Sequence, residues 1–203
     1  MSWHNGPRLA LGDGMTRLLN RTRSQRGFSL LEMLATLAIA GVVGGMATAQ
    51  MASVRRSMEG DGAMRLVMTQ MVTARETAVT QRRNIDVVFA GTNWVQTVRH
   101  EVPAGTTTLT SVAFEGKVQY ALLPSISDTP DLFGTANGVA FGGLTTLTFN
   151  SDGTLVDNAG NPINGTVFLA VPNITQSQRA VTVMGSTGRV RGYKWTGSGW
   201  IRI

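Results

Sequence analysis

The pattern of apolar and polar positions separates an apolar N-terminal stretch from a longer, mixed C-terminal part. Residues 33–54 contain no charged side chain and are rich in Leu, Ala, Val, Met and Gly. A helix of this length, 22 residues, spans about 33 Å, which matches the hydrocarbon core of a bilayer. We therefore predict a membrane-spanning helix and assign it to residues 28–54.

Apolar residues keep helical spacing beyond the charge-free stretch, so we expect the helix to continue as an amphipathic helix over residues 55–83. The apolar positions are Val54, Met58, Ala63, Leu66, Val67, Met71, Ala74 and Ala78. Gly60 and Gly62 are expected to soften or kink this helix, because glycine is a poor helix former. Four methionines, Met58, Met64, Met68 and Met71, fall in the same segment. Flexible Met side chains fill gaps in a core, so we interpret them as packing against a sheet and not as a ligand site.

From residue 84 the pattern changes to short β-type runs separated by turn residues. The predicted strands are Ile85–Ala90, Trp94–Arg99, Thr106–Phe114, Lys117–Leu123, Leu144–Asn150, Thr154–Val156, Val167–Val171, Ala180–Met184, Gly188–Trp195 and Trp200–Ile203. The pair Asp152-Gly153 predicts a tight hairpin turn, because glycine supplies a positive φ angle. Residues 124–138 contain two prolines and two glycines and predict a loop. Residues 84–203 therefore form a β-rich domain, and the fold class is α+β.

The charge of the chain is unevenly distributed. The formal net charge is +6, and the first 27 residues hold five arginines against Asp13, a balance of +4. By the positive-inside rule, this places the N-terminus in the cytoplasm and exports the C-terminal domain. Residues 158–203 carry five basic residues and no acidic residue, a local balance of +5. The N-terminal arginines therefore indicate the membrane topology of the chain, and only the C-terminal basic residues favour a polyanionic partner.

The chain offers no recognisable catalytic set. It has no cysteine, which rules out disulfides, thiolate zinc sites and a cysteine nucleophile. Its two histidines, His4 and His100, belong to no metalloprotease pattern, and no nucleophile elbow or phosphate-binding loop occurs. Asp152 and Asp157 lie beside turns, where Asp usually caps its own backbone and does not bind a cation. We predict no enzymatic activity, no cofactor and no metal site.

The string Arg26-Gly27-Phe28-Ser29-Leu30-Leu31-Glu32 resembles the processing site of type IV prepilins and type II secretion pseudopilins. The resemblance implies that residues 1–27 are a leader and that a prepilin peptidase/methyltransferase cuts between Gly27 and Phe28. Phe28 would then be the N-methylated first residue of the mature chain. A leader of 27 residues is long for this family, and a start at Met15 would leave 13. Both starts remain open.

Glu32 would be the fifth mature residue, which is the hallmark of this family. A carboxylate inside an apolar run is costly unless it has a partner. Glu32 of one subunit can neutralise the N-terminal amine of its neighbour when helices pack in a filament, since two buried charges are tolerable only when paired. We therefore expect Glu32 to act in filament assembly. From the apolar pattern alone, a carboxylate that merely reaches the membrane interface is the alternative.

The C-terminal half resembles the GspH/FimT family of pseudopilins. The similar segments are Leu147-Thr-Phe-Asn-Ser-Asp-Gly-Thr, Gly165-Thr-Val-Phe-Leu-Ala-Val, Ala180-Val-Thr-Val and Gly185-Ser-Thr-Gly-Arg-Val. The resemblance implies a long N-terminal helix packed on an antiparallel β-sandwich-like domain. It implies a minor pseudopilin of the type II secretion system, anchored by a single pass in the bacterial inner membrane with a periplasmic domain. The implied partners are other pseudopilins or pilins in a filament.

The string Gly188-Arg189-Val190-Arg191 supports a second hypothesis. Alternate residues of a strand point to the same face, so both arginines are expected on one face. The string also resembles the Gly-Arg-x-Arg motif of FimT-like minor type IV pilins that bind DNA for uptake in natural transformation. Arg189, Arg191 and Lys194 are therefore the candidate DNA-binding residues, because arginine contacts phosphate with two parallel hydrogen bonds. A solvated edge strand would carry the same charges.

Overall fold

The computed structural model describes residues 27–135 and 138–203. The predicted leader lies outside the described residues, except for Gly27. The chain divides into two compact units, residues 1–44 and 45–203, and each is described by itself.

In the first unit, Gly27, Phe28 and Ser29 precede helix α1 (Leu30–Gln81), which begins here. The Met33 N–H donates a hydrogen bond of 3.0 Å to the Ser29 carbonyl oxygen at the start of the helix. Between Gly27 and Gly44 the large apolar side chains are exposed, and Phe28 is 73% exposed. Leu30–Thr48 is long and apolar enough to cross a membrane, with a mean hydropathy of 1.9. This apolar segment indicates membrane anchoring.

In the second unit, α1 presents a continuous buried face at helical spacing. Its buried apolar side chains are those of Ala63, Met64, Val67, Met71, Ala74 and Ala78. The helix runs without interruption through Gly60 and Gly62 and ends at Gln81, two residues earlier than expected, where Arg82 has a φ of 49°. Met64 and Met71 pack in the core, as predicted, whereas Met58 is exposed.

The first sheet has five antiparallel strands in the order β3-β2-β1-β6-β7. They are β1 (Ile85–Ala90), β2 (Trp94–His100), β3 (Thr106–Ala113), β6 (Thr146–Phe149) and β7 (Leu155–Val156). Burial alternates along β1, so Ile85, Val87 and Phe89 point into the core. The β6–β7 hairpin turns at Gly153, whose φ is +86°, as the Asp-Gly pair predicted.

The second sheet is also antiparallel and has the order β11-β10-β9-β8-β4, with β5 pairing beside β8. Its elements are β4 (Gln119–Tyr120), β5 (Val139–Ala140), β8 (Gly165–Ala170), β9 (Arg179–Met184), β10 (Arg189–Trp195) and β11 (Trp200–Arg202). A short 3-10 helix, η1 (Thr175–Ser177), joins β8 to β9. Every residue of β8 is buried, and β8 pairs with β9 on one side and with β4 and β5 on the other.

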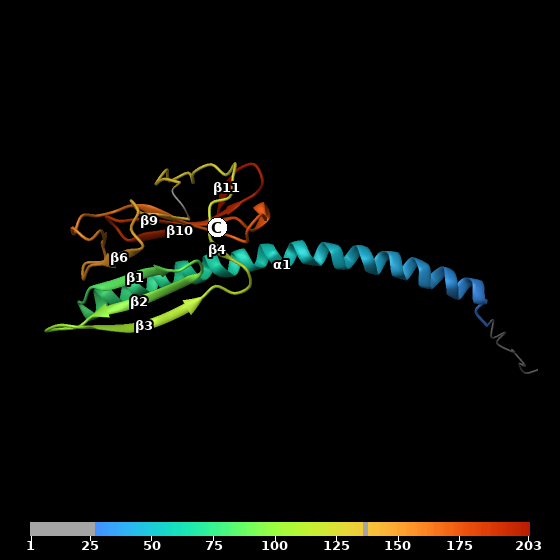
Figure 1. The fold of residues 1–203 in the computed structure, drawn as a ribbon, viewed down its shortest axis with the longest axis horizontal. Coiled ribbons are helices and arrows are strands. Elements are labelled where there is room, and N and C mark those ends of the chain that lie inside the picture. The colour runs from blue at the N-terminus through green and yellow to red at the C-terminus, as the bar shows by residue number, and fades with distance from the viewer. Residues whose placement is uncertain (1–26, 136–137) are drawn as a thin grey trace, which may run out of the picture. The chain divides into compact units, whose positions relative to one another are not determined.

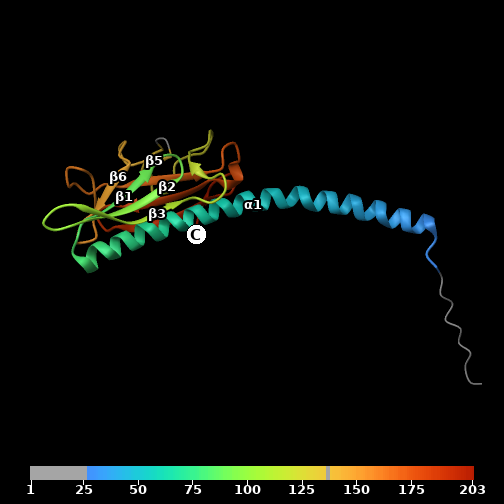
Figure 2. The same ribbon diagram turned by 60° about the horizontal axis from the view of Figure 1, so that its bottom comes forward.

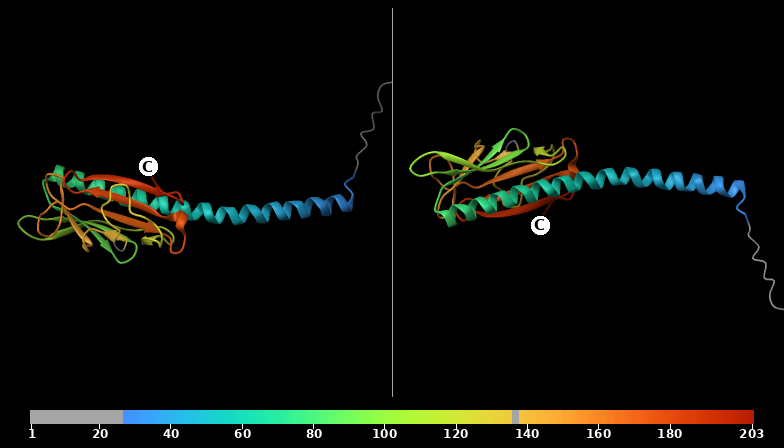
Figure 3. Two further views of the ribbon diagram at one scale, coloured as in Figure 1. Left: turned by 90° about the horizontal axis from the view of Figure 1, so that it is seen from above. Right: turned by 90° about the horizontal axis from the view of Figure 1, so that it is seen from below.

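Both sheets and the buried face of α1 enclose one hydrophobic core. Figure 1 shows the two sheets as layers, and Figures 2 and 3 show the teal and green part of α1 running alongside their strands. The predicted α+β fold is confirmed.

The predicted strand Lys117–Leu123 is wrong in length, since only Gln119 and Tyr120 pair with β8. The Ala121 N–H still donates to the Phe168 carbonyl of β8 at 3.0 Å, and the backbone after it hydrogen-bonds to a side chain in place of a strand. The buried Gln178 side chain accepts a hydrogen bond from the Leu123 N–H at 3.0 Å and donates one to the Ala121 carbonyl at 3.1 Å. This local substitution for a β-ladder has no signature in residues 117–123.

Candidate functional site

The N-terminal segment that resembles a processing site lies at the beginning of α1. Gly27 and Phe28 are exposed and lie outside the helix. Glu32 lies in the first helical turn, where the helix dipole favours a carboxylate, and it is also exposed. The three residues are therefore accessible to partners outside this chain.

The basic strand β10 is only partly covered. β11 pairs with Tyr193, Lys194 and Trp195, while the first residues of β10 pair only with β9. Arg189 is exposed, and Arg191 is partly buried. Both line one small surface depression, together with Asp131, Thr182 and Met184. The structure thus brings the two arginines together.

Arg191 already has an anionic partner. Its Nη1 forms an ion pair with Oδ1 of Asp131, which lies in the loop after β4. The other carboxylate oxygen accepts hydrogen bonds from Thr182 Oγ1 at 2.7 Å and from the Tyr193 hydroxyl at 2.9 Å. Burial raises the pKa of Asp131, but the hydrogen bonds from Thr182 and Tyr193 and the charge of Arg191 outweigh it, so the pKa lies below its ordinary value. Asp131 therefore stays ionised and neutralises Arg191.

Lys194 lies on the opposite face of β10 from the two arginines, because it is an odd number of positions away from both. Its Nζ lies 3.9 Å from Oδ2 of Asp61, which belongs to α1. Gly192, on the same face, lies against Met64 and Met68 of the helix. The structure therefore separates Lys194 from the arginine pair.

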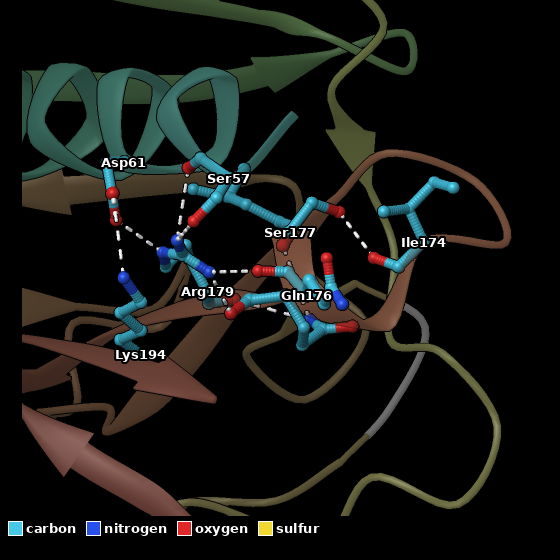
Figure 4. Close-up of polar contacts among 9 residues, drawn as sticks. Ser57, Asp61, Ile174, Gln176, Ser177, Arg179 and Lys194 are labelled. Atoms are coloured by element: carbon cyan, nitrogen blue, oxygen red, sulfur yellow. Dashed lines mark hydrogen bonds and ion pairs between the residues drawn. The ribbon is translucent and has the colours of Figure 1, made fainter. Parts of the chain in front are cut away.

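Arg179 is the strongest polar link between α1 and the second sheet. It is fully buried, and its Nε donates to Oδ1 of Asp61 at 2.5 Å. Its Nη2 donates to the Ser57 carbonyl and hydroxyl at 3.1 and 2.9 Å, and its Nη1 donates to the carbonyls of Gln176 and Gln178, both at 2.9 Å. Figure 4 shows the guanidinium pointing from β9 toward Ser57 and Asp61 of the helix. A side chain that the sequence places in a basic tail therefore has a structural role.

Residues 22–48 match the family model described as the prokaryotic N-terminal methylation motif. This range includes Gly27, Phe28 and Glu32 and reaches the end of the candidate membrane span. The N-terminal segment of the chain therefore carries a prepilin-type methylation motif. The motif implies processing by a prepilin peptidase and assembly with other pilins in a filament.

Two solved structures resemble this chain, and both are crystal structures of the type IV minor pilin FimU of Pseudomonas aeruginosa PAO1. Each is 16% identical in sequence. The TM-scores are 0.47 and 0.45, over 70% and 65% of this chain and 91% and 90% of the FimU chains. No curated protein sequence matches the chain.

Internal pairing reduces the basic character of the C-terminal part of the chain. Of its five basic residues, three face a carboxylate of the same unit: Arg179 and Lys194 face Asp61, and Arg191 faces Asp131. Both carboxylates come from outside residues 158–203. Arg189 and Arg202 remain as exposed cations.

The two aspartates beside turns cap their own backbone, as predicted. Asp152 Oδ1 accepts from the Thr154 N–H at 2.9 Å, and Asp157 Oδ1 accepts from the Ala159 and Asn161 N–H groups, both at 2.9 Å. These hydrogen bonds favour the ionised form, and the pKa of each carboxyl is lowered, chiefly by the Thr154 hydroxyl at Asp152 and by the Asn161 N–H at Asp157. Within residues 27–135 and 138–203, no group of three or more His, Asp or Glu side chains is placed to hold a metal ion.

Proposed function

We propose that this chain is a GspH-like minor pseudopilin of the type II secretion system, a structural subunit without catalytic turnover. It would sit at or near the tip of a short periplasmic pseudopilus whose growth moves folded proteins out of the cell. The N-terminal methylation motif supports a filament subunit, and the similarity of residues 147–190 to the GspH/FimT family supports the minor class. The observation that carries the choice of a structural role is the internal pairing of Arg179, Arg191 and Lys194, which leaves few cations for a polyanion.

The proposal includes the maturation of the chain. The peptidase cuts between Gly27 and Phe28 and methylates the amino group of Phe28. Before assembly the mature chain crosses the inner membrane once, with its N-terminus in the cytoplasm and its β-rich domain in the periplasm. The exposed position of Gly27 and Phe28, outside the helix, supports access for the peptidase.

Glu32 is proposed to join subunits. In a filament the carboxylate of one subunit pairs with the methylated amine of Phe28 in its neighbour, because each charge would be costly alone in an apolar bundle. The exposure of Glu32 in the first turn of α1 supports a partner from another molecule.

A chromosomal deletion in the source bacterium tests the choice of machine. We expect the deletion to abolish secretion of folded proteins and to leave DNA uptake unchanged. Complementation with the wild-type gene should restore secretion, and so should the double variant Arg189→Ala/Arg191→Ala, since its arginines have no part in secretion. Loss of DNA uptake with normal secretion would contradict the proposal.

The alternative is a FimT-like minor type IV pilin that captures DNA. The observation that favours it is the open stretch of β10, where Arg189 is exposed beside Arg191. DNA binding by the purified full-length chain, measured over a salt series, tests it. Salt-sensitive binding that the double arginine variant loses supports this alternative. Absence of binding at low salt eliminates it, because phosphate contacts are strongest there.

A further inference from the structure

A cleft of about 890 Å³ opens between α1 and the segment that joins β3 to β4. It lies wholly within the second unit. Its lining residues are Arg55, Arg56, Glu59, Gly116, Lys117, Gln119, Val171 and Pro172. Two elements that are far apart in the sequence therefore contribute basic side chains to one hollow.

The cleft has an excess of positive charge. Arg55 pairs with Glu59 at 3.3 Å, and the Arg55 side chain is 80% exposed while that of Glu59 is 17% exposed. Arg56 and Lys117 are both exposed, and neither forms an ion pair within the part of the chain that the structure describes. These two cations, with Arg55 beside them, are available to an anion from outside the chain.

The position of the cleft along α1 indicates where that anion comes from. The candidate membrane span ends at Thr48, in the same unit, and Arg55 and Arg56 follow it by seven and eight residues of helix. That separation is about 10–12 Å. The headgroup layer on each side of a bilayer is about 5–8 Å deep, and a long basic side chain can reach back over the remaining distance. Arg55 and Arg56 thus lie within reach of lipid phosphates.

We propose that this cleft binds the headgroup of an anionic phospholipid and so seats the β-rich domain on the membrane surface before the subunit enters a filament. The lipid phosphate contacts Arg56 and Lys117, with Arg55 shared between the phosphate and Glu59. The proposal rests on membrane anchoring of α1, and it is independent of the choice between a secretion and a pilus machine.

Lysine chemistry gives a direct test, because Lys117 and Lys194 are the only lysines in the chain. The mature full-length chain is reconstituted in nanodiscs of phosphatidylcholine, with or without phosphatidylglycerol. A neutral acetylating reagent is added, and the rate at each lysine is measured by peptide mass spectrometry. We expect phosphatidylglycerol to slow acetylation of Lys117 by about fivefold or more, since a basic residue near an anionic surface gains about that factor in affinity. The rate at Lys194 should not change.

Two variants that each remove one positive charge show whether the protection of Lys117 depends on the cleft. Arg56→Gln should remove most of the protection at Lys117. Arg82→Gln, the matched control, should retain it, because Arg82 is exposed and lies 26 residues further along the chain, near the end of α1.

Equal acetylation rates of Lys117 in both kinds of nanodisc would overturn the proposal. An equal slowing of Lys117 and Lys194 would also overturn it, because it would indicate a general surface effect. Equal slowing of Lys117 by soluble glycerol 3-phosphate in nanodiscs of phosphatidylcholine alone would overturn it as well, because it would indicate a site for free phosphate. If the chain does not co-elute with nanodiscs, membrane anchoring itself is refuted, and the proposed lipid cleft is refuted as well. Equal rates in a chain that does co-elute refute the lipid cleft alone.

Discussion

Gly60 and Gly62 of α1 should respond to alanine in opposite directions, although both lie in the same uninterrupted helix. A Cβ atom at Gly60 would lie 2.4 Å from the carbonyl oxygen of Ser177, while a Cβ at Gly62 would meet nothing within 4 Å. The carbonyl belongs to η1 and cannot shift cheaply, because the buried Ser177 hydroxyl accepts from the Val171 N–H at 2.8 Å and donates to the Ile174 carbonyl at 2.6 Å. Overpacking of this kind costs about 1–3 kcal/mol.

The matched substitution Gly62→Ala removes only the entropic penalty of glycine, which is about 0.5–1 kcal/mol in a helix. For a unit of this size, 1 kcal/mol changes Tm by about 2–4 °C. Gly60→Ala gains the same entropic term, so its net cost is up to about 2.5 kcal/mol. We therefore expect Gly60→Ala to lower the Tm of the β-rich unit by up to about 10 °C and Gly62→Ala to raise it by about 1–4 °C. Thermal unfolding of the full-length chain in detergent, followed by near-ultraviolet circular dichroism, measures both. If both variants raise Tm equally, Gly60 only softens the helix and the close contact with η1 is refuted.

Two further predictions concern the buried polar contacts of the same unit. Arg179→Ala should lower the free energy of unfolding by about 3–5 kcal/mol, because several carbonyls lose this donor and Asp61 keeps only its 3.9 Å contact with Lys194. The exposed Arg189→Ala should change it by less than about 0.5 kcal/mol. Denaturant titration compares the two variants, and equal losses of unfolding free energy would contradict the role of Arg179 as a link between α1 and the second sheet. Asp131→Asn should destabilise the unit by about 1–3 kcal/mol near neutral pH. Because folding lowers the pKa of Asp131 below its ordinary 3.8, its contribution is complete above that pH and is lost as the pH falls through the folded-state value. The difference between wild type and Asp131→Asn should therefore be constant from about pH 5 to 8 and shrink below 3.8; a difference that already shrinks at pH 5 would contradict the lowered pKa.

Features that depend on neighbouring residues could be predicted from the sequence. The hairpin of Ile85–Ala90 and Trp94–His100 follows from alternation of burial around a short turn, and the β6–β7 turn follows from Asp152-Gly153. The buried face of α1 follows from helical spacing in the same way. Each of these patterns lies within one short window of the chain.

The surroundings of the basic residues could not be predicted, because their partners are distant in sequence. Arg179 and Asp61 are 118 residues apart, and Arg191 and Asp131 are 60 apart. Strand parity places Lys194 on the face opposite Arg191, but only the tertiary structure shows that this face meets α1. Gly60 is a similar case. Only glycine fits at this position, because the carbonyl oxygen of Ser177, which is distant in sequence, lies where a Cβ atom would be.

The central claim is that this chain enters a filament through its processed N-terminus. The most direct test is to quantify, by mass spectrometry, the N-terminal peptide that begins at N-methylated Phe28, in purified filaments and in membranes from cells with wild-type chain or Glu32→Ala. We predict that both chains yield this peptide in membranes and that only the wild type yields it in filaments, because Glu32 pairs subunits and is not needed for cleavage. Equal amounts of the two chains in filaments, or a mature chain that begins at another residue, would contradict the account.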